Sequence, residues 1–476
     1  MRKRVLSFVL GIAFIFGAFA LPSCTPKGSG GESIPSDKTV LSVAYYAAGF
    51  GTGWMEDLKK RYEAAHPDVY IDLEGDPAIE TTVKDRLDTE KPNLADDVVV
   101  VGGMYYRYMI RNGYLSDMSD FYNEVVEGTD TVDSIVNQQL KDYLTVNGKT
   151  YGIPWQNNGM SFIYNANMFE QYKWKIPETM DEFFALCEQI LEDTKGGVHP
   201  LTFCGKANQG YFPNVMQTWV AQYEGMANMQ TFLNCETAEV YQQQEAARTK
   251  VYQTIAKILY GKDSKDRPYI DTSSRGYNHF DAQAEFLAGR SAMVVSGAWT
   301  QIEMSEYLVD YPGFKMGIMP VPHINADQKD KDGNDSSGVS TSDAGVMYIP
   351  ELSDQKELAR DFLKFSLTQE SLRRFVETTD GLTRPYTLKN PEQCSLNNYF
   401  AKTVFDYFTQ KQDRRVYMVS KSDIWLANEA SMWMCNDGAP VTALQGLTFE
   451  QAMKKASELA KEDYTEVRDK WNSWRV

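Results

Sequence analysis

A tryptophan followed by three amides is the stretch of this sequence whose side chains are best suited to binding a polar ligand. Trp155, Gln156, Asn157 and Asn158 come directly after residues 143–154, whose pattern predicts a hairpin. An aromatic ring covers the apolar C–H face of a polyhydroxy compound, and amides satisfy its hydroxyl groups. The alternative is that the ring lies in the core and the amides cap the next turn. We therefore treat Trp155, Gln156 and Asn158 as candidate ligand-binding residues.

A second set of aromatic residues lies at or just after the ends of two predicted strands. Tyr46, Phe50 and Trp54 surround the glycine-rich segment 47–53, and Tyr105 follows an uninterrupted run of valines. Ligands of α/β proteins bind at the carboxyl ends of strands, so Tyr46, Phe50 and Tyr105 are further candidates. Trp54 falls on a predicted helix face and is expected in the core, and core packing remains the alternative for the others as well.

No sequence motif indicates a catalytic centre. The chain has no G-x-S-x-G segment, and its four histidines share no metal-ligand spacing. Residues 328–339 resemble a calcium loop but begin with Gln328 and end with Val339, where a bidentate glutamate is needed. We expect no metal, no cofactor and no enzyme activity. A pair of glycosidase-type carboxylates leaves no local sequence signature, so a surface-anchored glycoside hydrolase stays an alternative.

The elements that would position these residues alternate between strand and helix. Strands are predicted at 41–46, 69–73 and 97–101, with helices at 54–66 and 79–87 between them. This order is typical of a doubly wound α/β unit. Residues 358–375 are predicted as one amphipathic helix, and most of the last hundred residues have helical periodicity.

Length and charge narrow the class of protein. With 476 residues, the chain is too long for one ordinary core, and two or three domains are expected. The net charge is −17. Phosphate backbones repel so acidic a chain, which argues against nucleic-acid binding.

The first 36 residues predict export and anchoring. Residues 2–4 are basic, residues 5–20 are mostly apolar, and residues 21–24 read Leu-Pro-Ser-Cys. The last four resemble the lipobox of bacterial lipoproteins, which implies a signal peptide over 1–23 and acylation of Cys24. Residues 24–36 would then be a flexible, lipid-anchored linker. An ordinary signal peptide and an uncleaved membrane helix are the alternatives.

Separated segments across the chain resemble the extracellular solute-binding proteins of carbohydrate ABC transporters, the group that includes maltose-binding protein. Their order and spacing, more than any one of them, carry the resemblance. The segments are residues 42–66, 97–105, 112–115, 147–155, 160–165, 176–183, 284–299, 316–320 and 381–385.

The resemblance implies a type II periplasmic-binding-protein fold, in which two α/β lobes joined by hinge segments enclose a sugar cleft. The N-terminal lobe would comprise 37–156 plus 336–384, and the C-terminal lobe 157–335 plus 385–476. It also implies a monomeric receptor that delivers its ligand to ABC permease subunits at the extracytoplasmic face of the cell membrane. It adds the ligand-binding candidates Tyr211, Asn214, Trp219, Trp299, Arg384 and Trp425.

The sequence departs from maltose-binding protein in ways that bear on the ligand. Residues 47–53 carry no charge where that protein has charged cleft residues, and Asn158 stands in place of a carboxylate. Fewer charges and more aromatic rings indicate a neutral sugar or oligosaccharide other than maltose. A receptor of the same fold for peptides or other polyols remains open.

Overall fold

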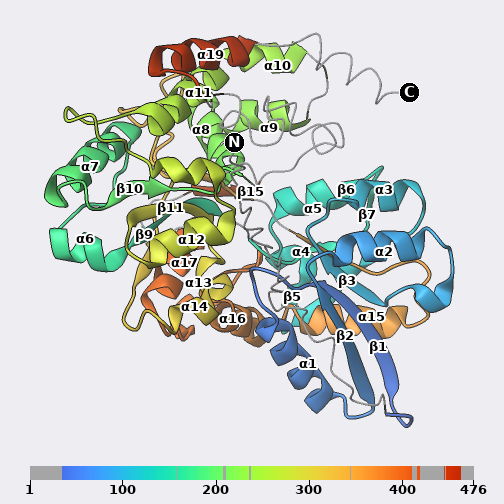
Figure 1. The fold of residues 1–476 in the computed structure, drawn as a ribbon. Helices are drawn as coiled ribbons and strands as arrows, with labels where there is room; N and C mark the ends of the chain where they lie inside the picture. Colours follow the sequence, from blue (N-terminus) through green and yellow to red (C-terminus); the bar gives the residue numbers. More distant parts are fainter. Residues whose placement is uncertain are drawn as a thin grey trace, which may run out of the picture.

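The computed structural model describes nine segments of the chain: residues 35–157, 159–206, 211–234, 237, 239–342, 345–409, 415–418, 444 and 446–461. Two β-sheets, each covered by helices, form two lobes (Figure 1).

The first sheet has the strand order β2-β1-β3-β14-β8. Strands β1, β2 and β3 run parallel, whereas β14 is antiparallel to both β3 and β8. The strands of this sheet are β1 (Thr39–Tyr46), β2 (Val69–Asp76), β3 (Val98–Val101), β8 (Ile153–Pro154) and β14 (Val346–Tyr348). Its helices are α1 (Gly53–Ala65), α2 (Ile79–Leu87), α3 (Tyr106–Arg111), α15 (Lys356–Phe365) and α16 (Gln369–Thr378).

Alternating residues of β1 and β3 serve two different cores. Val43 and Val98 belong to the buried cluster that contains α1 and α16, while Ala44 and Val99 belong to the cluster with α2 and α3. All four residues of β3 are buried. Since successive side chains of a strand point to opposite faces, an all-apolar strand predicts a sheet covered on both sides, and the structure confirms this doubly wound arrangement.

The second sheet has the order β10-β11-β9-β12, with β9 antiparallel to both of its neighbours. Its strands are β9 (Met160–Asn165), β10 (His199–Thr202), β11 (Ser291–Gly297) and β12 (Met316–Ile318). Around it lie α6 (Ala166–Tyr172), α7 (Met180–Asp193), α8 (Phe212–Glu224), α9 (Met226–Asn234), α10 (Glu239–Gln243), α11 (Glu245–Tyr260), α12 (His279–Leu287), α13 (Thr300–Glu303), α14 (Ser305–Leu308), α17 (Tyr399–Phe408) and α19 (Phe449–Lys461).

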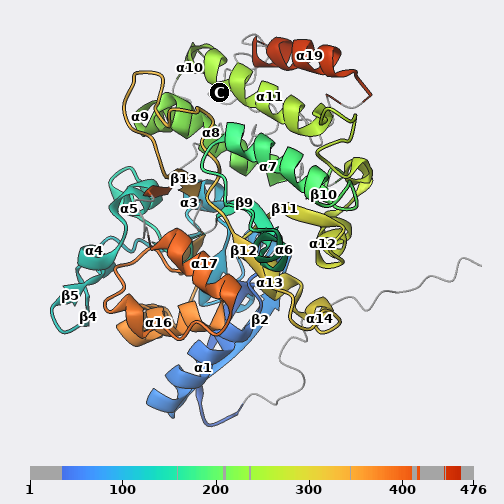
Figure 2. The same ribbon diagram turned by 90° about the vertical axis from the view of Figure 1, so that its left-hand side faces the viewer.

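The chain passes repeatedly between the two sheets. Residues 155–159 lead from β8 to β9, and residues 319–345 return from β12 to β14. The returning segment contains β13 (Val339–Ser342), which pairs in parallel with β15 (Arg415–Met418). After α16 the chain leaves the first lobe again, and α17 packs against β12 (Figure 2).

The remaining elements are short and border the first sheet. They are β4 (Val125–Glu127), β5 (Asp130–Thr131), α4 (Val132–Ile135), α5 (Gln138–Leu144), β6 (Thr145–Val146) and β7 (Lys149–Thr150). Among the described residues, 3₁₀ turns span Pro92–Leu94, Asp120–Asn123, Thr272–Gly276 and Pro391–Gln393. The predicted hairpin is confirmed, because β6 and β7 pair around Asn147 and Gly148. These two residues have φ values of 52° and 77°, as a tight hairpin turn needs.

The single helix predicted over 358–375 is wrong, because the segment folds as α15 and α16. Thr368 has an extended ψ of 151°, and its side chain accepts a hydrogen bond from the Ser371 N–H. A threonine in this position caps a new helix instead of continuing the old one. The apolar periodicity runs through both helices, so it does not reveal the break.

Candidate ligand-binding site between the lobes

Four aromatic side chains meet where the two lobes face each other. Tyr46 is the last residue of β1 and Phe50 follows that strand, Trp299 follows β11, and Tyr211 precedes α8. The Phe50 ring lies edge to face with Trp299, with centroids 5.9 Å apart, and Trp299 lies edge to face with Tyr211 at 5.9 Å. The centroid of Tyr46 is 6.4 Å from that of Phe50. We call these four residues the interlobe aromatic group.

Two glycines allow Trp299 to occupy this position. A Cβ on Gly297 would lie 2.0 Å from Trp299 Cζ3, and one on Gly49 would lie 2.6 Å from Trp299 Cδ1. Gly297 ends β11, on the same lobe as Trp299, whereas Gly49 belongs to the loop after β1 on the other lobe. The tryptophan is therefore enclosed from both sides, and only 7% of its surface is exposed.

Carboxylates from both lobes act on the half-buried Tyr46. Burial raises the pKa of Tyr46, and the negative charges of Glu303 and Glu80 raise it further. Glu303 lies at the end of α13 and accepts a hydrogen bond from Gln283 Nε2 at 2.6 Å. Glu80 lies in the first turn of α2. Carboxylates beside an aromatic ring can accept hydrogen bonds from hydroxyl groups of a ligand.

The backbone of Tyr105 lies beside Glu80, and its ring lies under Lys84 Nζ, 5.8 Å from the ring centroid. Its N–H donates to Glu80 Oε1 at 3.1 Å, and Glu80 also accepts backbone hydrogen bonds from Gly102, Gly103 and Met104. Burial raises the pKa of Glu80, and these N–H bonds partly oppose the rise. The side chain of Tyr105 is half-buried.

Two amide side chains lie on elements that lead to the aromatic group. Gln156 is 4% exposed, and its Oε1 has no hydrogen-bond partner in the described part of the chain. Asn214 is half-buried on α8 and donates from Nδ2 to Met160 Sδ at 2.9 Å. Thioethers are weak acceptors, so a ligand oxygen can compete for this donor.

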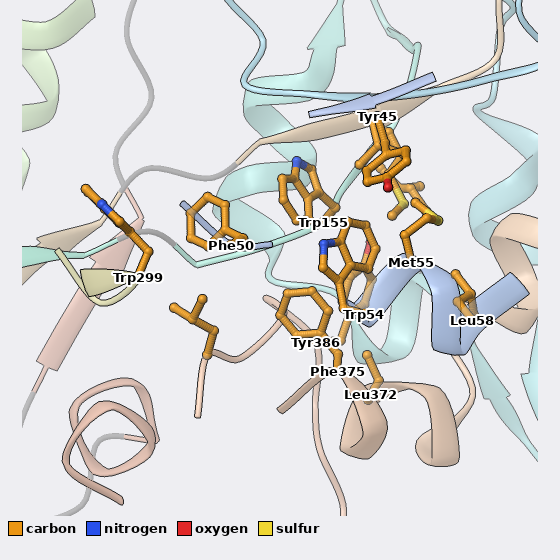
Figure 3. Close-up of a cluster of buried hydrophobic side chains, with 14 of the residues drawn as sticks. Tyr45, Phe50, Trp54, Met55, Leu58, Trp155, Trp299, Leu372, Phe375 and Tyr386 are labelled. Atoms are coloured by element: carbon orange, nitrogen blue, oxygen red, sulfur yellow. The ribbon is translucent and has the colours of Figure 1, made fainter. Parts of the chain in front are cut away.

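Three of the residues predicted to bind a ligand lie in the interior, where their N–H groups already donate hydrogen bonds within the protein. Trp155 is fully buried and stacks on Trp54 at 5.0 Å, and its Nε1 donates to the Val101 carbonyl (Figure 3). Trp219 is equally buried and donates to the Pro322 carbonyl. In this conformation neither indole offers a face to a ligand, because hydrophobic packing against neighbouring elements covers both.

Arg384 is the third such residue. It is 5% exposed, and its Nε donates to the Trp155 carbonyl at 2.8 Å while Nη1 donates to the Ser366 carbonyl at 2.7 Å. Burial lowers its pKa to about 10. The guanidinium thus joins the crossing segment to α15, and we do not retain Trp155, Trp219 or Arg384 as ligand contacts.

Asn158, Trp425 and Cys24 lie outside the described residues. In the predicted loop 328–339, Asp330 Oδ1 accepts the backbone N–H groups of Asp332 and Asn334, at 2.9 and 2.8 Å. Across the described segments there is no group of three or more His, Cys, Asp or Glu side chains that could hold a metal ion.

Sequence reasoning missed Glu80, Glu303 and the two glycines. A carboxylate in the first turn of a helix, opposite a Gly-Gly loop that exposes N–H groups, is a signal that could have indicated Glu80. For Glu303 and the glycines no local signal exists, because their role depends on the approach of a second lobe.

Comparison with known proteins agrees with this architecture. Among solved structures, the apo form of RafE from Streptococcus pneumoniae superposes with a TM-score of 0.65 at 16% identity, covering 92% of this chain and all of that one. The stachyose complex of a sugar transporter protein from Bacillus licheniformis superposes with a TM-score of 0.57 at 17% identity, covering 90% of this chain and all of that one. These likenesses confirm the two-lobed binding-protein fold.

Two curated relatives extend the comparison. The multiple sugar-binding protein of Streptococcus mutans is 23% identical over 69% of this chain and 70% of its own length. The melibiose/raffinose/stachyose-binding protein MelE of Bacillus subtilis is 26% identical over 42% of this chain. The chain spans only 30% and 43% of the lengths of the first two curated relatives that it matches.

The described helices include none that is long and apolar enough to cross a membrane. Residues 57–394 match the family model described as bacterial extracellular solute-binding protein, and this match covers well over half of the chain. The chain therefore belongs to the bacterial extracellular solute-binding protein family.

Proposed function

We propose that this protein is the sugar receptor of an ABC importer, which captures a neutral sugar or oligosaccharide between its lobes and delivers it to membrane permease subunits. The observation that carries the proposal is the interlobe aromatic group, in which rings from both lobes meet and the carboxylates of Glu80 and Glu303 act on one of the rings. Rings cover the C–H faces of a sugar, and the polar groups satisfy its hydroxyls.

The lobes would comprise residues 37–156 plus 336–384 and residues 157–335 plus 385–476. Ligand contacts would come from Tyr46, Phe50, Tyr105, Gln156, Tyr211, Asn214 and Trp299, with Glu80 and Glu303 added and with Asn158 and Trp425 as predictions from the sequence.

The contacts that enclose Trp299 support a hinge motion of the two lobes. Phe50 and the loop at Gly49 lie against this indole, so a sugar reaches its face only when the lobes separate. Closure around the sugar would then form contacts to both lobes at once. A ligand that binds the closed form better shifts the population toward it, and the permease would recognise that form.

The relatives suggest which sugars to test first. MelE is named for melibiose, raffinose and stachyose, and a solved relative holds stachyose. We propose α-linked oligosaccharides of this kind as the leading candidates for the ligand, ahead of maltose.

Thermal unfolding of the protein from Thr25 onward, against a panel of melibiose, raffinose, stachyose, maltose and xylo-oligosaccharides, tests the proposal. A sugar present at about 100 times its dissociation constant adds about 2.7 kcal/mol to the stability of a receptor that binds it only when folded. A sugar-specific rise in Tm supports the proposal. The proposal would be wrong if no sugar of the panel raised the Tm. If peptides raised the Tm instead, the protein would be a peptide receptor.

Binding without turnover separates the receptor from a glycoside hydrolase. The stabilising sugar should be recovered intact after prolonged incubation. If it is cleaved, and if Glu80→Gln or Glu303→Gln abolishes the cleavage, the protein is a hydrolase.

We also propose lipid anchoring through Cys24 at the extracytoplasmic face of the cell membrane. Expression in a bacterial host with labelled palmitate should label the wild type and leave Cys24→Ser unlabelled. Equal labelling of both would show that this cysteine is not the anchor.

A further inference from the structure

A buried amide on α12 holds one of the carboxylates that lie beside the interlobe aromatic group. Gln283 is 1% exposed, and its helix packs against β11. Its Nε2 donates to Glu303 Oε2 at 2.6 Å and lies 3.4 Å from Ser296 Oγ. One side chain of α12 therefore connects the end of β11 to the end of α13.

The same cluster fixes the turn that carries Trp299. Thr300 Oγ1 lies 2.7 Å from Ser296 Oγ and 2.6 Å from the carbonyl oxygen of Gly297. Ser296 and Thr300 are fully buried. Because Trp299 directly precedes Thr300 in the chain, these hydrogen bonds hold the backbone from which its indole projects. Gln283 thus belongs to a network that places both Trp299 and Glu303.

Glu303 keeps one carboxylate oxygen for a ligand. Its side chain is 15% exposed, and Oε2 accepts the bond from Gln283. Oε1 lies 4.0 Å from His279 Nε2, and among the described residues it accepts no hydrogen bond. The charge of Glu303 helps to raise the pKa of Tyr46, as expected for a carboxylate near that ring. A carboxylate oxygen accepts from a hydroxyl group, and such charge-assisted bonds are stronger than those between neutral groups.

Stability alone does not account for a glutamine at position 283. Its neighbours Ala282, Phe286 and Leu287 on α12 belong to the apolar core. Gln283 Oε1 is buried and has no hydrogen-bond partner in the described part of the chain. An unpaired buried acceptor is destabilising, and an apolar side chain of the same length carries no such cost. The donor end of the amide is bonded to Glu303, so the side chain serves the placement of that carboxylate.

We propose that Gln283 is a positioning residue for ligand binding, which aims Glu303 Oε1 at a hydroxyl group of the sugar unit that lies against Trp299. The inference rests on the proposed function and adds the residue that sets the direction of one polar contact. A hydrogen bond weakens steeply when its geometry departs from the preferred one. A glutamate that is already held also loses less side-chain entropy when the sugar binds.

A double-mutant cycle with Gln283→Met and Glu303→Met tests the proposal on the protein from Thr25 onward. Isothermal titration calorimetry measures the affinity of each variant for melibiose, raffinose, stachyose, maltose and xylo-oligosaccharides, and thermal melts measure its stability. Gln283→Leu is a second apolar substitution at the same position. Gln253→Met is the matched control, because it removes an amide that donates to Ser457 Oγ at 3.0 Å, between α11 and α19.

Gln283→Met and Gln283→Leu should bind the stabilising sugar about tenfold more weakly than the wild type, while their Tm stays close to the wild-type value. In the Glu303→Met background, Gln283→Met should change the affinity by less than about twofold, because the carboxylate that it positions is already gone. Gln253→Met should bind as the wild type does. A role of Gln283 in core packing alone would instead lower the Tm and weaken binding equally in both backgrounds.

Two results would overturn the positioning role and leave the sugar receptor intact. One is wild-type affinity in both Gln283 variants, and the other is the same weakening with and without Glu303. If none of the sugars bound even the wild type, the proposed function itself would fail, and the role of Gln283 in sugar binding would fail with it.

Discussion

The rings of Phe50 and Trp299 join the two lobes edge to face, with centroids 5.9 Å apart and planes inclined by 72°. One ring follows the first strand of the first sheet, and the other follows the central β11 of the second sheet. A single buried cluster accordingly runs from α1 through both rings to α12. The contact between Phe50 and Trp299 is therefore part of the packing that holds the two lobes together.

Trp299→Ala should weaken binding of the stabilising sugar by about 1–3 kcal/mol, because an aromatic platform for one sugar face is lost. Isothermal titration calorimetry measures the change. Tyr307→Ala, which removes an exposed ring on neighbouring α14, is the control and should bind as the wild type does. Wild-type affinity in Trp299→Ala would remove this residue from the site.

Gly49→Ala should shift the unliganded protein toward an open form. The added methyl would meet Trp299 Cδ1 at 2.6 Å across the lobes, and separation of the lobes relieves that overlap. Small-angle scattering should show a larger radius of gyration, and the sugar should bind about tenfold more weakly, or by about 1.4 kcal/mol. Gly53→Ala is the matched control, because its Cβ would meet nothing within 4 Å. Identical scattering of the two variants would contradict the prediction.

Arg384→Met should lower the free energy of unfolding by about 3–5 kcal/mol. The substitution leaves the buried carbonyls of Trp155 and Ser366 without their donor, and such groups are expensive to bury unpaired. Urea unfolding measures the loss. Arg374→Met, at a more exposed ion pair with Asp57, should cost about 1 kcal/mol or less. If both variants lost the same free energy of unfolding, the buried hydrogen bonds of Arg384 would contribute no more to stability than the more exposed ion pair of Arg374.

Glu224 should make stability depend on pH. Burial raises its pKa from 4.5 to about 7, and the nearby Lys331 opposes the rise while Asp332 and Asp330 add to it. Between these pH values the folded state holds a proton that the unfolded state releases, so the free energy of unfolding falls as pH rises. Relative to Glu224→Gln, the wild type should lose on the order of 1–3 kcal/mol from pH 4.5 to pH 7.5.

Urea unfolding at each pH measures this difference. Glu306→Gln, an exposed carboxylate on α14, serves as the control and should follow the wild-type profile. Parallel profiles for the wild type and Glu224→Gln would mean that Glu224 ionises alike in the folded and unfolded states.

Thr368→Ala should destabilise the protein by about 1 kcal/mol, because the first turn of α16 loses the acceptor for the Ser371 N–H. Thr368→Ser keeps the oxygen and should recover most of the loss. Thermal melts compare the three proteins. A melt of Thr368→Ala that coincides with the wild type would contradict the capping role.

Local patterns were enough to predict several features of this protein. The valines of β3 predict a strand buried on both faces, Asn147-Gly148 predicts a tight turn, and the alternation of strand and helix predicts the first lobe. Each of these depends on neighbouring residues alone: on side-chain alternation, on positive φ, or on periodicity. Several separated segments each resemble the family only slightly, but their order along the chain also indicated the family.

Only the tertiary structure decided which aromatic residues are available to a ligand. Trp155 and Trp299 look alike in sequence, since each follows a strand and was predicted to bind. Trp54 stacks on Trp155 and removes it from the surface, whereas Trp299 lies between the two lobes, against Phe50 of the other lobe. Glu80 and Glu303 are far apart in the chain, yet the folded structure brings both close enough to raise the pKa of Tyr46. Exposure and proximity depend on how distant segments pack, and a linear pattern carries no information about the partner that covers a side chain.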